Sequence, residues 1–188
     1  MQSVWSTSKI PSINKYKPGG TGICTNGKAS GRIKKSDKDE FGRWAYQILD
    51  GKGKKEIFII SIYQCCRSKG PNTAYQQQMM MHTMDDKKKL DPRKLFYRDI
   101  VAMINKHKEQ NPEIIPILLG DWNEEFTTTL IPAQLCDDFN LDNIFDQMHP
   151  DHGKFRTYKS GSSVIDFALA PPEIADSVTN FVYEPFLY

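Results

Sequence analysis

The interpretation of this chain starts from the stretch Ile114-Ile115-Pro116-Ile117-Leu118-Leu119-Gly120-Asp121-Trp122-Asn123-Glu124-Glu125. Its apolar first half, bounded by turn-forming residues, predicts a buried strand. The polar residues that follow would then lie at the rim of a sheet, where open sheets commonly bind ligands. The alternative is a plain turn in which Asp and Asn stabilise the backbone. The stretch alone favours neither interpretation.

Length and composition indicate one globular domain. The chain has 188 residues, enough for a substantial core, and 39% of them are apolar, more than a disordered chain contains. No apolar run is long enough to span a bilayer, and the polar N-terminal segment does not resemble a signal peptide. The four cysteines have no zinc-binding spacing. We therefore expect reduced thiols and an intracellular protein.

Charge gives little evidence about partners. The formal net charge of +2 is too small to indicate nucleic-acid binding by itself. Lysines cluster at Lys34–Lys35, Lys52–Lys55 and Lys87–Lys89. Such clusters usually lie in solvated loops, and phosphate binding is the less favoured alternative.

The first half of the chain predicts strands followed by helices. Residues 1–17 show no periodicity and are expected to form an irregular arm, with a single domain over 18–188. A glycine-led strand is expected at 19–25, and an antiparallel hairpin across 41–63, with its turn signalled by Asp50-Gly51.

Two helices are expected next, at 71–84 and 91–107. In the second helix Asp91 is the expected N-cap and Pro92 suits the first position. His82 and His107 have no partner at metal-ligand spacing, so we expect ordinary surface histidines.

The second half predicts a short helix near Pro132–Cys136 and a second hairpin from Phe155 to Ala170, turning at 160–162. His149 and His152 flank a loop and are expected to be solvated rather than metal ligands. Asp166 lies within the otherwise apolar returning strand. An unpaired carboxylate is costly to bury, so Asp166 either faces outward or has a function.

Several motifs, taken in order, resemble the endonuclease/exonuclease/phosphatase superfamily, the pancreatic-deoxyribonuclease-like fold of Mg²⁺-dependent phosphodiesterases. The box at 120–123 resembles the family's Gly-Asp-Phe-Asn motif, with Trp122 for Phe. The strand Val164-Ile165-Asp166-Phe167 resembles its Ile/Leu-Asp-Tyr strand. Supporting similarities are the strand ending in Tyr63, the segment 18–23 and Gly42-Arg43-Trp44. The resemblance covers roughly residues 18 to 175 and implies a two-sheet α/β/β/α sandwich, incomplete at its terminal strands.

The resemblance also implies residue roles. Asp121 would orient and deprotonate the attacking water, Asn123 would hold the scissile phosphate, Tyr63 would contact a phosphate oxygen, and Asp166 would orient a histidine. The implied cofactor is Mg²⁺, with Mn²⁺ as the alternative, bound through Asp121 and Glu124. We also expect that three further residues touch the substrate phosphates: Arg67, Arg156 and Thr157.

Two family features are not found in the sequence. Members carry an Asn and the principal metal-binding Glu before the glycine-led strand, and a catalytic His after a strand that would follow Pro185-Phe186-Leu187-Tyr188. We therefore expect a fragment of a nuclease-derived domain, acting on nucleic acid or another phosphodiester, with weak or no activity. The alternatives are an inositol-phosphate phosphatase-like domain and a non-catalytic remnant that binds nucleic acid or a protein partner.

Overall fold

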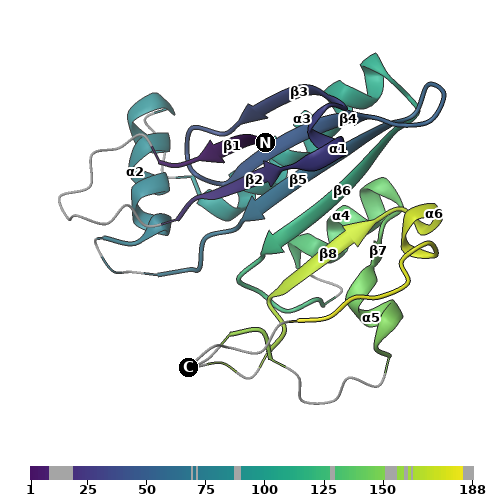
Figure 1. The fold of residues 1–188 in the computed structure, drawn as a ribbon. Coiled ribbons are helices and arrows are strands. Elements are labelled where there is room, and N and C mark those ends of the chain that lie inside the picture. Colours follow the sequence, from purple (N-terminus) through teal and green to yellow (C-terminus); the bar gives the residue numbers. More distant parts are fainter. Residues whose placement is uncertain are drawn as a thin grey trace.

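The computed structural model describes residues 1–8, 19–68, 70, 72–86, 90–127, 130–150, 156–158, 161 and 163–183. Its centre is a six-stranded mixed sheet with the strand order β3-β4-β5-β6-β8-β7 (Figure 1). The strands are β3 (Ile33–Lys38), β4 (Trp44–Asp50), β5 (Glu56–Tyr63), β6 (Ile114–Asp121), β7 (Asp142–Asn143) and β8 (Asp166–Ala170). Because β5 and β6 are parallel and β6 and β8 are antiparallel, the last residues of β5 and β6 and the first residue of β8 lie at the same end of the sheet.

A second, two-stranded sheet packs on one face of β4 and β5 (Figure 1). It consists of β1 (Gln2–Ser6) and the expected glycine-led strand, β2 (Thr21–Thr25). The expectation of an irregular arm is therefore wrong for Gln2–Ser6. This strand has little periodicity of its own, and it is specified by pairing: Trp5 lies so close over Gly22 that a Cβ there would be 2.4 Å from the indole. The expected boundary between 17 and 18 falls outside the described residues.

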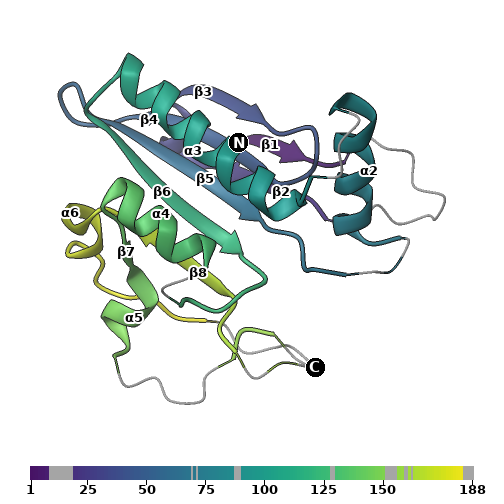
Figure 2. The ribbon, with the colours of Figure 1, turned by 180° about the vertical axis from the view of Figure 1, so that it is seen from behind.

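Helices cover the opposite face of the large sheet. Between β5 and β6 lie α2 (Ala74–Asp86) and α3 (Pro92–Gln110), and Figure 2 shows α3 lying across β4 and β5. The shorter helices are α1 (Gly27–Ser30), α4 (Ile131–Phe139), α5 (Ile144–Met148) and α6 (Pro172–Ala175). The face of α3 that carries Phe96, Ile100 and Ile104 is buried in the core with Ile60 and Leu118. No helix in the described part of the chain is long and apolar enough to cross a bilayer.

The main local predictions are confirmed. The hairpin across 41–63 forms between β4 and β5, with Trp44 opposite Ile62. The helices expected at 71–84, 91–107 and 132–136 correspond to α2, α3 and α4. Asp91 caps α3 by accepting a hydrogen bond from the Arg93 amide at 3.0 Å.

The structure differs from the second hairpin expected between Phe155 and Ala170. Strand β8 begins at Asp166, and its partners are β6 and β7 rather than the preceding segment. Thr157 and Tyr158 lie in a bend, and the Thr157 amide donates to the Ser163 carbonyl at 3.2 Å. Among the described residues, strand β8 itself pairs only with β6 and β7. Phe155 and His152 lie outside the described residues.

The two helix histidines are buried, contrary to expectation. His107 is 5% exposed and His82 is 6% exposed. His107 follows Ile100 and Ile104 at helical spacing, so it shares their core-facing side and meets the Tyr46 hydroxyl at 3.2 Å. His82 stacks on Phe41 with ring centroids 4.4 Å apart. Burial lowers the pKa of both imidazoles.

Candidate active site

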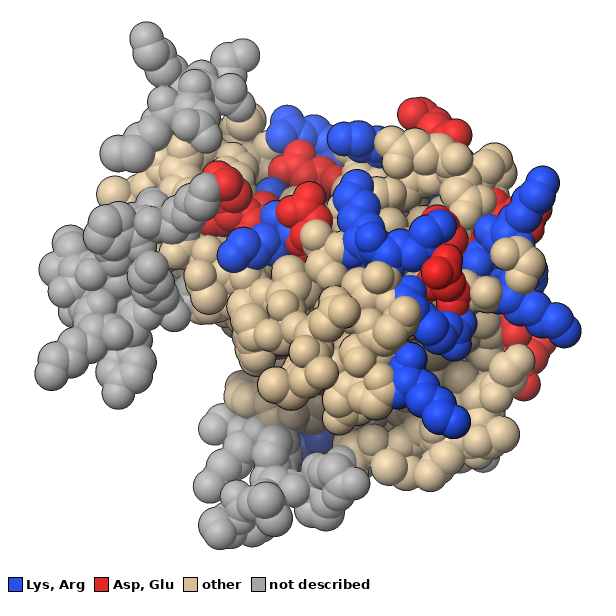
Figure 3. Space-filling model, turned by 45° about the horizontal axis from the view of Figure 1, so that its top comes forward, with Lys and Arg blue, Asp and Glu red and all other residues tan. Residues whose placement is uncertain are grey.

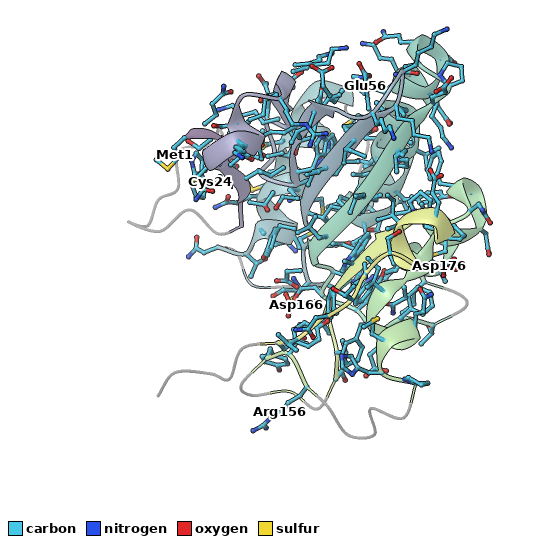
Figure 4. The ribbon with its side chains drawn as sticks, turned by 45° about the vertical axis from the view of Figure 1, so that its right-hand side comes forward. Met1, Cys24, Glu56, Arg156, Asp166 and Asp176 are labelled. Carbon is cyan, nitrogen blue, oxygen red and sulfur yellow. The ribbon has the colours of Figure 1, made fainter. Side chains whose placement is uncertain are left out.

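Three of the predicted site residues lie together at one end of the large sheet, where three neighbouring strands end or begin. Tyr63 ends β5, Asp121 ends β6 and Asp166 begins β8. In the strand register, Asp121 stands beside Tyr63 on one side and opposite Asp166 on the other. Figure 4 shows Asp166 at the start of β8, next to the end of β6. The strand register therefore brings these three residues together where the strands end.

Gly120 lets β6 approach β5 at this edge. Its φ is +145°, and a Cβ at this position would lie 2.1 Å from the carbonyl oxygen of Ile62. Any side chain would push the strands apart just before Asp121. The glycine of the sequence motif is therefore required by the close backbone approach.

The motif turns directly after Asp121. Asn123 adopts the left-handed conformation with φ 48°, and its amide donates to Asp121 Oδ1 at 3.0 Å. Trp122, between them, is fully buried; its ring stacks on Phe167 and its Nε1 donates to the Phe167 carbonyl at 3.1 Å. If the chain were extended here, Asp121 and Asn123 would point to the same face of the strand, because side chains two residues apart do so. A tight turn brings them together instead.

Gln64, which we did not predict as a site residue, holds this turn. Its amide donates to the Asp121 carbonyl at 2.8 Å, and its Nε2 donates to the Trp122 carbonyl at 2.9 Å. Its own carbonyl accepts from Asn123 Nδ2 at 2.8 Å. One fully buried glutamine thus contacts each of three consecutive motif residues. The only signal in the sequence is a polar residue directly after a buried strand.

Burial makes ionisation costly for both carboxylates, and for Asp121 the facing charge adds to that cost. Burial, followed by the charge of Asp166, raises the pKa of Asp121 to about 6, although the hydrogen bonds from Asn123 oppose this. Burial also raises the pKa of Asp166, opposed by the Thr157 hydroxyl. In the described part of the chain, no Lys, Arg or His forms an ion pair with either carboxylate. The pair therefore favours binding of a proton or a cation.

Tyr63 and Thr157 complete the immediate surroundings. Burial and the charge of Asp121 raise the pKa of Tyr63 to about 12, so its hydroxyl stays protonated and can donate. Thr157 Oγ1 accepts from the amides of Ile165 and Asp166 at 2.9 and 3.1 Å, which fixes the start of β8.

The predicted arginines lie farther out. Figure 4 shows Arg156 beyond Asp166, with its exposed side chain directed away from it. Arg67 is also exposed, and its Nη2 lies 3.6 Å from Asp91 Oδ2. The structure therefore does not bring either arginine into direct contact with the carboxylate pair.

Glu124 does not have the environment expected of a metal ligand. It forms an ion pair with Arg93, and both side chains are 9% exposed. Its second oxygen accepts from the Ile131 amide at 3.1 Å. Its charge is compensated by Arg93 within the protein, so we do not propose Glu124 as a metal ligand.

Metal binding at this edge would depend on few protein ligands. Within the described residues, no group of three or more His, Cys, Asp and Glu side chains is arranged to hold a metal ion. Mg²⁺ retains several waters and is usually bound through one or two carboxylates. The uncompensated pair Asp121 and Asp166 fits such a hydrated ion.

Comparison with solved structures shows that the chain has a DNase I-like fold. The catalytic domain of human Nocturnin, solved with a bound sulfate anion, matches 91% of this chain with a TM-score of 0.58 and 13% identity. This confirms the fold that the motifs predicted.

Two further structures match less closely. They are an endonuclease/exonuclease/phosphatase family protein from Leptotrichia buccalis (13% identity, 92% of this chain, TM-score 0.44) and the 3′ phosphatase NExo from Neisseria bound to a product DNA hairpin (12%, 72%, 0.40). The chain covers 60%, 59% and 54% of the Nocturnin, Leptotrichia and NExo chains, respectively. No protein-family model and no curated protein matches the sequence.

Proposed function

We propose that the strand-end site is the phosphate-processing centre of a Mg²⁺-dependent phosphodiesterase that acts on nucleic acid. The observation that carries the proposal is the half-buried carboxylate pair, Asp121 opposite Asp166, with no cationic partner in the described residues. Such a pair is costly to maintain without a function that uses it. The DNase I-like fold supports the same assignment.

Each residue has a role that its environment favours. Hydrolysis of a phosphodiester needs an aligned water and stabilisation of charge on the phosphoryl group. Asp121 would orient the attacking water and accept its proton, the role that the family resemblance implies. The Tyr63 hydroxyl donates to a phosphate oxygen. Asn123, which donates a side-chain hydrogen bond to the Gln64 carbonyl and lies next to Asp121, would hold the scissile phosphate.

The metal would bind at the carboxylate pair. Asp121 and Asp166 would hold Mg²⁺, or Mn²⁺ with the same ligands, and the ion would neutralise charge on the phosphoryl group. Thr157 keeps Asp166 in place through two backbone amides. Arg67 and Arg156 would contact phosphates on either side of the scissile one.

A Mg²⁺ titration of the full chain tests the proposal. Carboxyl ¹³C NMR should show saturable shifts of Asp121 and Asp166 and a fall in the pKa of Asp121. Thermal unfolding should show stabilisation of about 1.4 kcal/mol at a Mg²⁺ concentration ten times Kd. Asp121→Asn should abolish both effects, whereas Asp137→Asn, which removes an exposed carboxylate from α4, should preserve them. Unshifted carboxylates in millimolar Mg²⁺ would disprove the proposal.

A further inference from the structure

A cationic pocket lies next to the strand-end site. It has a volume of about 410 Å³ and is lined by the segment after β5, the start of α3, the segment after β6 and the start of α4. Its charged lining residues are Arg67, Arg93, Lys94 and Glu124, three cations against one carboxylate. Cations therefore outnumber carboxylates among the lining residues, while Asp91 lies beside the pocket, 3.6 Å from Arg67.

Arg93 is the fixed cation of this pocket. Its side chain is 9% exposed, and its ion pair with Glu124 holds one end of the guanidinium while the group still lines the cavity. Burial and the neighbouring charge of Arg67 both lower the pKa of Arg93. The two cations repel each other although each lies beside one carboxylate, Glu124 for Arg93 and Asp91 for Arg67, and a bound anion would relieve that repulsion.

The remaining walls suit a ring-sized organic group. Tyr97 presents its ring to the cavity, and its hydroxyl is bound to Asp138 Oδ2 at 2.6 Å. Leu130 and Ile131 add aliphatic surface. A cavity of this volume falls within the range of small-molecule sites and exceeds what a lone inorganic anion fills. Cationic and apolar walls together match a phosphate joined to a base.

The pocket is connected to the carboxylate site through the motif turn. Glu124, which holds Arg93, directly follows Asn123 in the chain, and the Cys66 thiol beside Arg67 donates a hydrogen bond to Asn123 Oδ1. The pocket and the carboxylate site are therefore built on consecutive residues of the same turn.

We propose that this pocket is a nucleotide subsite, which binds a phosphate group of the substrate other than the one that is cleaved. Its place in catalysis rests on the proposed function of the strand-end site, whereas the binding itself does not. Arg93 provides the buried contact, and Arg67 and Lys94 provide the exposed ones.

The test measures binding of 5′-AMP and adenosine to the full chain by calorimetry in the presence of EDTA. AMP should bind saturably and adenosine at least tenfold more weakly. Arg67→Gln and Lys94→Gln should each weaken AMP binding about three- to tenfold, because each removes a charge-assisted but solvent-screened contact. Arg93 is left unchanged, since its removal would leave Glu124 buried without a partner.

A matched control lies on the same helix. Lys106→Gln removes an exposed charge from α3 far from the pocket and should change AMP affinity less than twofold. An equal loss in this variant would show a general charge effect and overturn the inference, as would adenosine binding as tightly as AMP. A dinucleotide with one internal phosphate distinguishes the source: tighter binding than AMP indicates a nucleic-acid strand, and weaker binding indicates a free nucleotide.

The outcome is separable from the test of the proposed function. Asp121→Asn should leave AMP affinity in EDTA unchanged. If Mg²⁺ fails to shift the carboxylates while the pocket variants behave as expected, the phosphodiesterase proposal fails and the pocket remains. If AMP binding does not respond to Arg67→Gln or Lys94→Gln, the pocket inference fails alone.

Discussion

Asp121 and Asp166 are held opposite each other by strand pairing, so the backbone keeps both carboxylates in the same place at the strand ends. Gly120 and Gln64 enforce this arrangement from two sides, one by allowing close strand approach and the other by fixing the turn. Such strain is typical of functional sites, where the stability of the protein is lowered for the sake of chemistry.

Asp121→Asn should therefore stabilise the protein in a pH-dependent way. The raised pKa means that the folded state binds the proton more tightly than the unfolded state, so the stability contributed by this group falls as pH rises from about 4 to about 6. At pH 7.5 the variant should be more stable by about 1 kcal/mol, a figure reduced for partial exposure. Urea unfolding across this pH range measures it.

The difference between the two proteins should disappear near pH 4, where the wild-type carboxyl is protonated. Asp137→Asn serves as the control and should show no such pH-dependent gain. A variant that is no more stable than wild type at pH 7.5 would contradict the conclusion that Asp121 is strained.

At the scale of elements, the start of β4 is tied to α3 by a buried ion network. Arg43 is 2% exposed and donates from Nε and Nη2 to the two oxygens of Asp39, at 2.9 and 3.0 Å. Its Nη1 donates to Asp99 of α3 at 3.0 Å, and its guanidinium lies 4.2 Å from the Trp44 ring centroid. This network fixes the helix that carries Arg93 and Lys94.

Arg43→Met should lower the free energy of unfolding by about 3–5 kcal/mol, because it leaves the buried Asp39 without a cation. Arg98→Met is the matched control: Arg98 also contacts Asp99 but its side chain is 63% exposed, so the loss should stay below about 1 kcal/mol. Chemical denaturation of both variants measures the difference. Similar losses would show that the Arg43 network is not important for stability.

Elements with strong internal patterns were predictable, and elements defined by distant partners were not. The hairpin across 41–63 and helix α3 follow from alternation, a turn signal and a cap. Strand β1 depends on Gly22, and the pairing of β8 depends on the open edge of β6. No local pattern contains either relationship.

The same division holds for the candidate site. The position of Asp121 followed from polar residues at the end of an apolar run, and Tyr63 and Asp166 were identified through the family resemblance; Asp166 begins β8 instead of lying within a strand. The clamp by Gln64 and the compensation of Glu124 by Arg93 involve residues far apart in sequence, so only the folded chain reveals them.

At the scale of the whole molecule, we expect at most slow hydrolysis. Among the described residues, no histidine pairs with Asp166, and general acid–base assistance is worth about 10²–10⁴ in rate. Catalytic groups that act as a unit also fail together. Nicking of supercoiled plasmid with Mg²⁺ or Mn²⁺, compared with Asp121→Ala, measures this. Robust nicking that Asp121→Ala abolishes would show that other residues supply the assistance.

Nucleic-acid binding should be weak and sensitive to salt. Figure 3 shows Lys and Arg side chains interspersed with Asp and Glu on one face, rather than forming a continuous basic surface. With few phosphate contacts, affinity should still fall as salt concentration rises, but with a shallow slope.

The direction of β5 has a practical consequence for experiments. The strand leaves the Gly51–Lys55 turn and reaches the site at Tyr63, a span of about 23 Å at the usual strand rise. Lys52 and Lys54, in that turn, are exposed, whereas Gly53 between them has a φ of +71° that a side chain would strain. A fluorophore or an affinity handle introduced into this turn would report on the molecule, or anchor it to a support, while the strand ends stay open to solution.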